Sequence, residues 1–301
     1  MKAILANNIV KSYPLGKKTK VEALKGISFE VNSGEMFGLI GPDGAGKTSL
    51  FRIFTTLLLP DSGTATVLGY NTVSEYQKIR NEVGYMPGRF SLYTDLTVEE
   101  NLNFFANIFH TTVKENYHLI KEIYQQIEPF KHVRAGKLSG GMKQKLALSC
   151  ALIHKPKVLF LDEPTTGVDA VSRKEFWELL KQLKSQGITI LVSTPYMDEA
   201  SMCDKVGLIQ DGRLMKVSTP EELKQTFGRK LLAVKTSNRK MMMEQLTTIE
   251  GVDSVYPFGE THHVVLKQGL DQIVLPEGIE ARAISPDIED CFILLMRTHV
   301  G

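Results

Sequence analysis

Short runs of apolar residues, each ending in turn-forming residues, mark the first two-thirds of the chain. They occupy residues 36–40, 158–161 and 188–192. Continuous apolar runs of this length are typical of parallel strands that are buried on both faces. Between them lie helix-period patterns, such as those over 49–58 and 173–186. This alternation predicts an α/β fold built on a largely parallel sheet.

Two segments depart from this alternation. Residues 4–12 and 27–31 have the pattern of short antiparallel strands around a polar turn at 15–20, which predicts an N-terminal antiparallel β layer. Two long helix-period stretches between residues 97 and 127 predict a helical subdomain inserted over about 89–155.

The pattern restarts after Phe227, and we therefore expect a first domain at 1–226 and a C-terminal accessory domain at 227–301. In the second domain the expected order is strand, helix, two strands, a weak segment, strand and helix, which resembles a small split-βαβ, ferredoxin-like α+β module. The expected strands are 231–236, 252–257, 263–267 and 279–284, and the expected helices are 240–249 and 288–298.

Composition narrows the class of protein. Of the 301 residues, 43% are hydrophobic and 23% are charged, and the net charge is +2. These values are typical of a globular protein with a sizeable core, and the even charge gives no sign of a nucleic-acid partner. No stretch approaches 18 consecutive apolar residues, so we expect any membrane role to come through a partner. The three widely spaced cysteines indicate reduced thiols in a cytosolic protein.

Residues 41–48 fit the phosphate-loop pattern G-x-x-x-x-G-K-[ST]. An apolar strand pattern precedes the loop and a helical pattern follows it, which disfavours the alternative of a tight turn before an ordinary helix. Glycines let the backbone N–H groups wrap a phosphate, and the following helix points its positive end at the anion. Lys47 supplies a positive charge to the outer phosphates, and the Thr48 hydroxyl is placed to ligate Mg²⁺.

A pair of acids, Asp162 and Glu163, follows the apolar run at 158–161. An acid at the carboxyl end of a strand in the same sheet as the phosphate loop can hold the metal through water. The next acid could orient and deprotonate an attacking water. The alternative is two solvated acids at the start of a loop.

The segment Leu138-Ser139-Gly140-Gly141 precedes an apolar helical pattern at 146–153. Ser139 is a good N-cap, and the two glycines expose backbone donors at the positive end of a helix. On these grounds the segment is either a second anion site or a plain helix cap.

The order of these three motifs resembles the nucleotide-binding domain of ABC transporters, over residues 1–226. The resemblance implies a P-loop NTPase core, ATP and Mg²⁺ as ligands, Thr48 and Asp162 at the metal, and Glu163 as the catalytic base. It matches Tyr13 to an aromatic that stacks on adenine, although an ordinary core or surface tyrosine is the alternative. The residues expected at ATP are Tyr13, Gly41, Pro42, Asp43, Gly44, Ala45, Gly46, Lys47, Thr48 and Ser49.

In that family two ATP-binding domains close head to tail, so that Ser139, Gly140 and Gly141 would contact ATP held by a second ATP-binding subunit. Asp169 would lie in the loop that crosses this interface. A transmembrane subunit would be the other partner, which implies a position on the cytoplasmic face of the cell membrane. Residues 194–200, followed by Cys203 and Asp204, resemble the exporter branch of the family, which includes multidrug exporters. The tail at 285–292 resembles the C-terminal extension of drug and polysaccharide exporters.

Two positions depart from the family pattern. The family has a metal-ligating Gln after a strand-end Tyr-x-Pro, where this chain has Gly88. It also has a His that contacts the γ-phosphate after Ser-Thr, where this chain has Pro195. The change is either tolerated drift with slower hydrolysis or the mark of an asymmetric motor. In the second case this chain's own site turns over slowly, while its intact Ser-Gly-Gly segment completes a competent site on a different subunit.

The expected function is therefore an ATP-hydrolysing subunit that powers export through a separate transmembrane subunit. Two alternatives stay open: a soluble ABC-type ATPase that is not tied to transport, and a non-hydrolysing ATP-sensing module. Phe90, Leu92 and Tyr93 lie where this family contacts its membrane partner, and burial in the helical subdomain is the other explanation for their apolar character.

Overall fold

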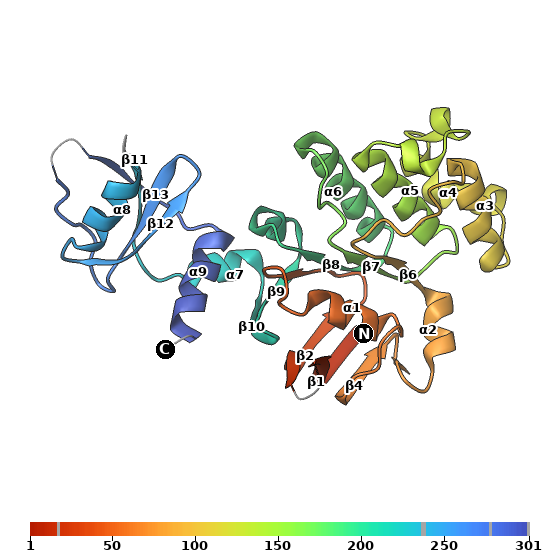
Figure 1. The fold of residues 1–301 in the computed structure, drawn as a ribbon, viewed down its shortest axis with the longest axis horizontal. Helices are drawn as coiled ribbons and strands as arrows, with labels where there is room; N and C mark the ends of the chain where they lie inside the picture. Colours follow the sequence, from red (N-terminus) through yellow and green to blue (C-terminus); the bar gives the residue numbers. More distant parts are fainter. Residues whose placement is uncertain (17–18, 236–238, 277–278, 300–301) are drawn as a thin grey trace. The chain divides into compact units, whose positions relative to one another are not determined.

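The computed structural model describes residues 1–16, 19–235, 239–276 and 279–299 (Figure 1). It divides into two compact units, residues 1–220 and residues 221–301. The division lies ahead of the boundary expected near Phe227. Part of the turn predicted at 15–20 and the last residue of the strand predicted at 231–236 lie outside the described residues.

The centre of the first unit is a six-stranded sheet in the order β10-β9-β3-β8-β7-β6 (Figure 1). The five strands from β9 to β6 run parallel, and β10 is antiparallel to β9. The apolar runs that predicted parallel strands form β3, β7 and β8, whose side chains are all buried. The strands are β3 (Met36–Ile40), β6 (Val83–Met86), β7 (Val158–Asp162), β8 (Thr189–Thr194), β9 (Lys205–Gln210) and β10 (Arg213–Ser218).

A second, antiparallel sheet with the order β2-β1-β4-β5 forms the N-terminal layer. Its strands are β1 (Lys2–Leu15), β2 (Thr19–Asn32), β4 (Ser62–Val67) and β5 (Tyr70–Asn71). Helix α1 (Lys47–Phe54) contacts strands of both sheets. The buried Phe54 ring stacks on Phe160 of the central sheet and meets Phe29 of the N-terminal sheet edge-on, so aromatic packing holds the two layers and α1 together.

Helix α1 ends earlier than the pattern over 49–58 predicted. Thr56 has a φ of 64°, in the left-handed region that ordinary residues rarely adopt, and a helix cannot continue through it. Leu57 and Leu59 follow it as exposed side chains. The sequence showed apolar residues here, but it gave no sign of the change in backbone direction.

Helices occupy most of the segment between β6 and β7, as the helix-period stretches predicted. Thr97 with Glu100 and Thr112 with Glu115 form capping boxes that start α3 and α4. Helix α5 contacts both α3 and α4. The helices around this segment are α2 (Tyr76–Glu82), α3 (Val98–Ile108), α4 (Val113–Tyr124), α5 (Gly140–Leu152) and α6 (Ala170–Ser185), with 3₁₀ turns at Glu128–Phe130, Ala135–Lys137 and Met197–Met202.

The second unit contains an antiparallel sheet in the order β12-β13-β11-β14. One apolar cluster joins α8 to this sheet and includes the buried side chains of Val234, Leu246 and Val264. Its elements are β11 (Leu231–Lys235), α8 (Arg239–Thr247), β12 (Val252–Phe258), β13 (Thr261–Leu266), β14 (Glu280–Ile284) and α9 (Ile288–His299), and α7 (Pro220–Gln225) precedes them.

The order of strands and helices along the second unit is the one expected from the sequence. Among the described residues between β13 and β14 no helix occurs, and the second long helix, α9, comes after β14. Ile273 and Leu275 instead pack against the apolar cluster from a segment without regular secondary structure. A non-helical segment therefore covers part of this unit's core.

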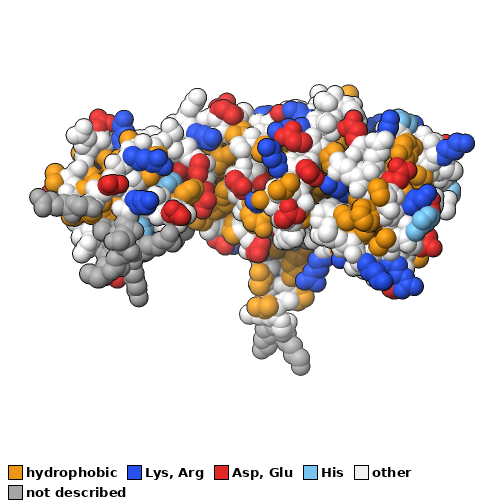
Figure 2. Space-filling model, turned by 90° about the horizontal axis from the view of Figure 1, so that it is seen from above, with side chains coloured by type: hydrophobic (Ala, Val, Ile, Leu, Met, Phe, Trp, Pro, Cys, Tyr) orange, Lys and Arg blue, Asp and Glu red, His pale blue; other side chains and the backbone are white. Residues whose placement is uncertain are grey.

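Within the described residues, no helix is both long enough and apolar enough to cross a bilayer. Figure 2 shows basic and acidic side chains interspersed over the face in view, in keeping with the small net charge.

His154, after the end of α5, ties the helical segment to the central sheet. Its Nε2 lies 3.0 Å from the carbonyl oxygen of Val83 at the start of β6, and its ring stacks on Phe109 with the centroids 3.7 Å apart. Burial lowers the pKa of His154, although the hydrogen bond to the Val83 carbonyl and the negative charge of Glu82 act to raise it. The buried Nδ1 has no hydrogen-bond partner among the described residues, which fits a neutral ring.

We expect His154 to make the stability of the chain depend on pH. Its pKa is lower in the folded chain than the value of about 6.5 in the unfolded chain, so the unfolded chain binds more protons between the two values. The contribution of the neutral His154 ring to the free energy of unfolding is therefore complete above about pH 6.5 and is lost as the pH falls. Urea unfolding midpoints at pH 5 and pH 8 should differ less for His154→Gln than for the wild type. The exposed His132, changed to Gln, is the control, and equal differences in all three proteins would contradict the assignment.

Candidate functional site

The phosphate-loop pattern lies between β3 and α1, at the carboxyl end of a buried parallel strand. Two of its glycines are required by close backbone contacts. A Cβ on Gly41 would lie 2.1 Å from the carbonyl oxygen of Ile209, and a Cβ on Gly46 would lie 2.4 Å from that of Ala23. Gly46 also has a φ of 105° and directly precedes α1. Since glycine has no side chain, it leaves the first amides of the helix uncapped and available to an anion.

Lys47 is buried in this loop, with 3% of its side chain exposed. Its Nζ donates to the carbonyl oxygens of Gly41 at 2.8 Å and Pro42 at 3.1 Å. The same atom lies 3.1 Å from Oε1 of Glu163. The lysine predicted to meet phosphates and the glutamate predicted to act as a base therefore form an ion pair, although they are far apart in sequence.

The carboxylate pair lies at the end of β7 and is held by a residue of the neighbouring strand. Asp162 is 2% exposed, and the Ser193 hydroxyl donates to its Oδ1 at 2.6 Å. The backbone N–H of Glu163 donates to the hydroxyl and the carbonyl oxygen of the same serine, at 3.0 and 3.1 Å. Glu163 has a φ of 51°, an uncommon conformation for a residue with a side chain. Ser193 thus fixes the turn that places the two acids.

Sequence reasoning did not single out Ser193 as a functional residue. Its position at the end of the apolar run over 188–192 was the available signal, because parallel strands end at the same edge of a sheet. The register pairs Asp162 directly with Ser193. Only a correct pairing of the two runs could have found this contact from the sequence.

Tyr13 lies beside the phosphate loop, on the N-terminal layer. Its hydroxyl is 3.0 Å from the Ser49 hydroxyl, and its ring is half-buried. Lys11 lies over the ring, with Nζ 6.0 Å from the centroid. A partly open aromatic face next to the loop is what stacking on a base requires.

Ser139 caps α5, its hydroxyl accepting from the N–H of Met142 at 3.3 Å. The two glycines after it approach the segment that starts α6. A Cβ on Gly141 would lie 2.8 Å from the Ser172 hydroxyl, and one on Gly140 would lie 3.3 Å from the carbonyl oxygen of Gly167. Among the described residues, no hydrogen bond or ion pair joins Ser139, Gly140 or Gly141 to this chain's own phosphate loop.

Asp169 caps α6 next to this segment. Its carboxylate accepts from the N–H groups of Val171 at 3.1 Å and Ser172 at 3.0 Å. The hydrogen bonds with Ser172, more than that with Val171, lower the pKa of Asp169. Asp169 therefore stands at the positive end of a helix, at an exposed point of the loop.

Of the two residues expected to depart from the family pattern, Gly88 lies against the carboxylate pair. A Cβ on Gly88 would lie 3.0 Å from the carbonyl oxygen of Asp162 and 3.7 Å from Cβ of Glu163. Pro195 follows Thr194, the last residue of β8, and offers no backbone N–H. A side chain at residue 88 would therefore require the Asp162 carbonyl to move slightly.

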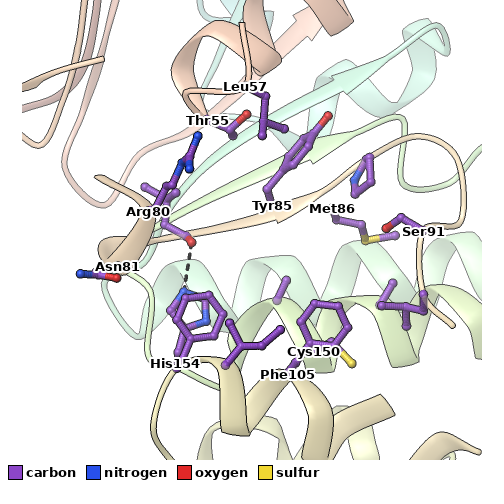
Figure 3. Close-up of a pocket in the computed structure, with 17 residues that line it drawn as sticks. Thr55, Leu57, Arg80, Asn81, Tyr85, Met86, Ser91, Phe105, Cys150 and His154 are labelled. Carbon is purple, nitrogen blue, oxygen red and sulfur yellow. Dashed lines mark hydrogen bonds between the residues drawn. The ribbon is translucent and has the colours of Figure 1, made fainter. Parts of the chain in front are cut away.

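An apolar groove lies between β6 and the helices α3 and α5, as Figure 3 shows. Phe105 and Phe109 form part of its wall together with Tyr85, and Arg80 and Asn81 supply polar groups at one end. Of the three apolar residues considered for membrane-subunit contact, Leu92 lines the groove and is buried. Tyr93 is 51% exposed and packs edge-on against Phe104.

Comparison with known proteins gives consistent matches. A family model described as ABC transporter matches residues 24–166. The chain is 40% identical over 304 residues to the probable multidrug ABC transporter ATP-binding protein YbhF of Escherichia coli. The aligned region covers 97% of this chain and 52% of YbhF. The chain therefore spans about half the length of that relative.

Two other relatives are covered more fully. The doxorubicin resistance ATP-binding protein DrrA of Mycobacterium tuberculosis is 34% identical, over 91% of this chain and 81% of DrrA. The linearmycin resistance ATP-binding protein LnrL of Bacillus subtilis is 38% identical, over 74% of this chain and 71% of LnrL.

Solved structures agree in fold. The dimeric structure of MJ0796, a bacterial ABC transporter cassette, superposes with a TM-score of 0.66 at 26% identity, covering 72% of this chain and 98% of that one. A dimeric post-hydrolysis state of MJ0796 with ADP and Pi gives 0.65 at 25% identity, with the same coverage. With the phosphate loop, the carboxylate pair and the Ser-Gly-Gly segment on this fold, the chain belongs to the ABC transporter family as one of its ATP-binding proteins.

Proposed function

We propose that the chain is the ATP-hydrolysing motor subunit of an ABC exporter and powers export through a separate transmembrane subunit. The observation that carries this proposal is the ion pair between Lys47 and Glu163 at the edge of the parallel sheet. It supports the proposal because the lysine expected at the outer phosphates and the glutamate expected to act as the base lie 3.1 Å apart. The multidrug and drug-resistance names of YbhF and DrrA support the export direction.

Each residue at this point has a distinct role in the proposed reaction. Lys47 and the amides at the start of α1 hold the phosphates, and the ring of Tyr13 stacks on adenine. Thr48 and Asp162 offer a hydroxyl and a carboxylate, the hard oxygen ligands that suit Mg²⁺. When bound, this ion neutralises charge on the phosphates. Glu163 orients a water and takes its proton.

A second ATP-binding subunit completes the site. Because Ser139, Gly140 and Gly141 lie apart from this chain's own phosphate loop, they are free to contact ATP on a partner, and Asp169 lies beside them. The dimeric forms of MJ0796 support such an arrangement. With Gly88 and Pro195, the chain lacks the Gln side chain that would ligate the metal and the His side chain that would contact the γ-phosphate. We therefore propose that this chain's own site turns over slowly and is paired with a more active one.

The groove supports a helix of the transmembrane subunit as the other partner, which would hold the chain on the cytoplasmic face of the membrane. Its apolar wall with a few polar groups at one end suits the apolar face of an amphipathic helix. The same groove disfavours the two alternatives, a soluble ABC ATPase and an isolated ATP-sensing module, since neither needs a place for a membrane subunit.

Two substitutions separate binding from chemistry. Lys47→Ala removes the charge that meets the phosphates, and we expect Mg-ATP affinity to fall by at least about tenfold. Glu163→Gln keeps the shape of the site, and we expect near wild-type affinity with single-turnover hydrolysis reduced by about 10²-fold. Calorimetric titration and rapid quench measure the two quantities. Lys181→Ala, at an exposed ion pair, is the control. Undiminished hydrolysis in Glu163→Gln would show that Glu163 is not the base.

The proposed asymmetry predicts a higher rate of ATP hydrolysis when the missing Gln and His side chains are restored. Gly88→Gln combined with Pro195→His should raise the single-turnover rate of the lone chain by about tenfold or more. Pro195→His alone should give part of the gain, because it avoids the 3.0 Å contact at residue 88. Vigorous hydrolysis by the unmodified lone chain, abolished by Glu163→Gln, would overturn the asymmetry.

The groove can be tested by placing a charge on its wall. Phe105→Asp should weaken binding to the membrane subunit by more than about 30-fold, since buried aromatic anchors dominate such interfaces, and leave ATP affinity unchanged. Phe130→Asp, at an exposed aromatic outside the groove, is the matched control. Co-purification from detergent-solubilised membranes is the measurement. Equal recovery of both variants would exclude the groove as the docking site.

A further inference from the structure

Glu199 is a buried acid to which the proposed reaction gives no role. It lies in the 3₁₀ turn Met197–Met202 and is 3% exposed. Both oxygens of its carboxyl group accept hydrogen bonds from threonine hydroxyls, Oε1 from Thr165 at 2.8 Å and Oε2 from Thr194 at 2.5 Å. Burying an acid in this way costs free energy unless its oxygens are paired, so the arrangement is a specific one.

The two threonines belong to different elements at the candidate site. Thr165 is 1% exposed in the loop of residues 163–169, which begins at Glu163 and ends at Asp169. Thr194 is fully buried at the end of β8, directly after Ser193. The Thr194 hydroxyl also accepts from the N–H of Tyr196 at 3.0 Å, which holds the chain in place as it passes Pro195.

A third element reaches the same carboxyl group. Arg173 on α6 has its Nε 3.9 Å from Oε1 of Glu199, and its guanidinium lies over the ring of Tyr196 with 4.9 Å to the centroid. Helix α6 is the one that Asp169 caps. Glu199 is therefore linked to the loop, to the strand end and to the helix that follows the loop.

We propose that Glu199 is a positioning residue that fixes loop 163–169 to the end of β8. Ser193 holds the start of this loop through the N–H of Glu163, and Glu199 holds its middle through Thr165. The loop contains left-handed residues, Glu163 at φ 51° and Gly167 at φ 75°, so it is not supported by regular secondary structure. With both ties in place, Glu163 and Asp169 keep a fixed relation to each other.

The proposal rests on the roles proposed for Glu163 and Asp169, and it adds how the two are coupled. A displacement of Glu163, the proposed base, would therefore move Asp169 as well, because the loop between them is held rigidly. Asp169 is the residue proposed to face the second subunit. Within the described residues, the side-chain partners of Glu199 are Thr165, Thr194 and Arg173, and no hydrogen bond or ion pair joins it to Lys47, Asp162 or Glu163.

The test combines amide hydrogen exchange with kinetics on the full chain. Glu199→Gln keeps the side-chain volume, and Thr165→Val removes one hydroxyl without changing shape. In both variants we expect the amides of residues 164–169 to exchange about tenfold faster, with β7 and β8 unchanged. Single-turnover hydrolysis should fall by about tenfold while Mg-ATP affinity stays within about twofold.

Two controls separate positioning from a general loss of stability. Thr165→Ser keeps the hydroxyl and should restore wild-type exchange and turnover. Glu178→Gln changes an exposed acid of α6 that pairs with Lys181 and not with Glu199, Thr165 or Arg173, and it should have no effect. Wild-type exchange of the loop in both Glu199→Gln and Thr165→Val would overturn the proposal. Because exchange needs no hydrolysis, an inactive wild-type chain would contradict the proposed function and leave this test decisive.

Discussion

The ion pair between Lys47 and Glu163 is the contact on which the candidate site depends. Lys47 begins α1 after the loop that follows β3, and Glu163 directly follows β7. Strands β3 and β7 are both neighbours of β8 in the central sheet. Because all three strands are parallel, their carboxyl ends meet at one edge. The strand between them supplies Ser193, which positions both acids. The fold thereby brings a cation expected to bind phosphate, a candidate base and a candidate metal ligand together from distant parts of the sequence.

The sequence predicted the features that a short local pattern determines. The glycines at 41 and 46 were expected to let backbone N–H groups wrap a phosphate. The structure adds a second reason for them, because backbone oxygens lie 2.1 and 2.4 Å from where their Cβ atoms would be. The strands at 36–40 and 158–161 were expected from continuous apolar runs, and both are fully buried. Such features depend on residues that are neighbours in the chain.

Features that depend on pairing between distant segments were not predicted. Ser193 and Glu199 act through hydrogen bonds that cross 31 and 34 residues of sequence, and no local pattern contains that information. Strand β4 was missed because half of its side chains are exposed and its apolar character is weak. In the second unit the expected order of elements along the chain is found, while the segment around Ile273 packs without regular secondary structure.

The central claim is that ATP phosphates are held at the point where Lys47 meets Glu163, with the metal on Thr48 and Asp162. A crystal structure of the Glu163→Gln chain soaked or grown with Mg-ATP tests it most directly. The account predicts the outer phosphates within hydrogen-bond distance of Lys47 Nζ, the metal bound through the Thr48 hydroxyl and near Asp162, and adenine on Tyr13. Nucleotide bound away from the 41–48 loop, or a metal held by other residues, would contradict it.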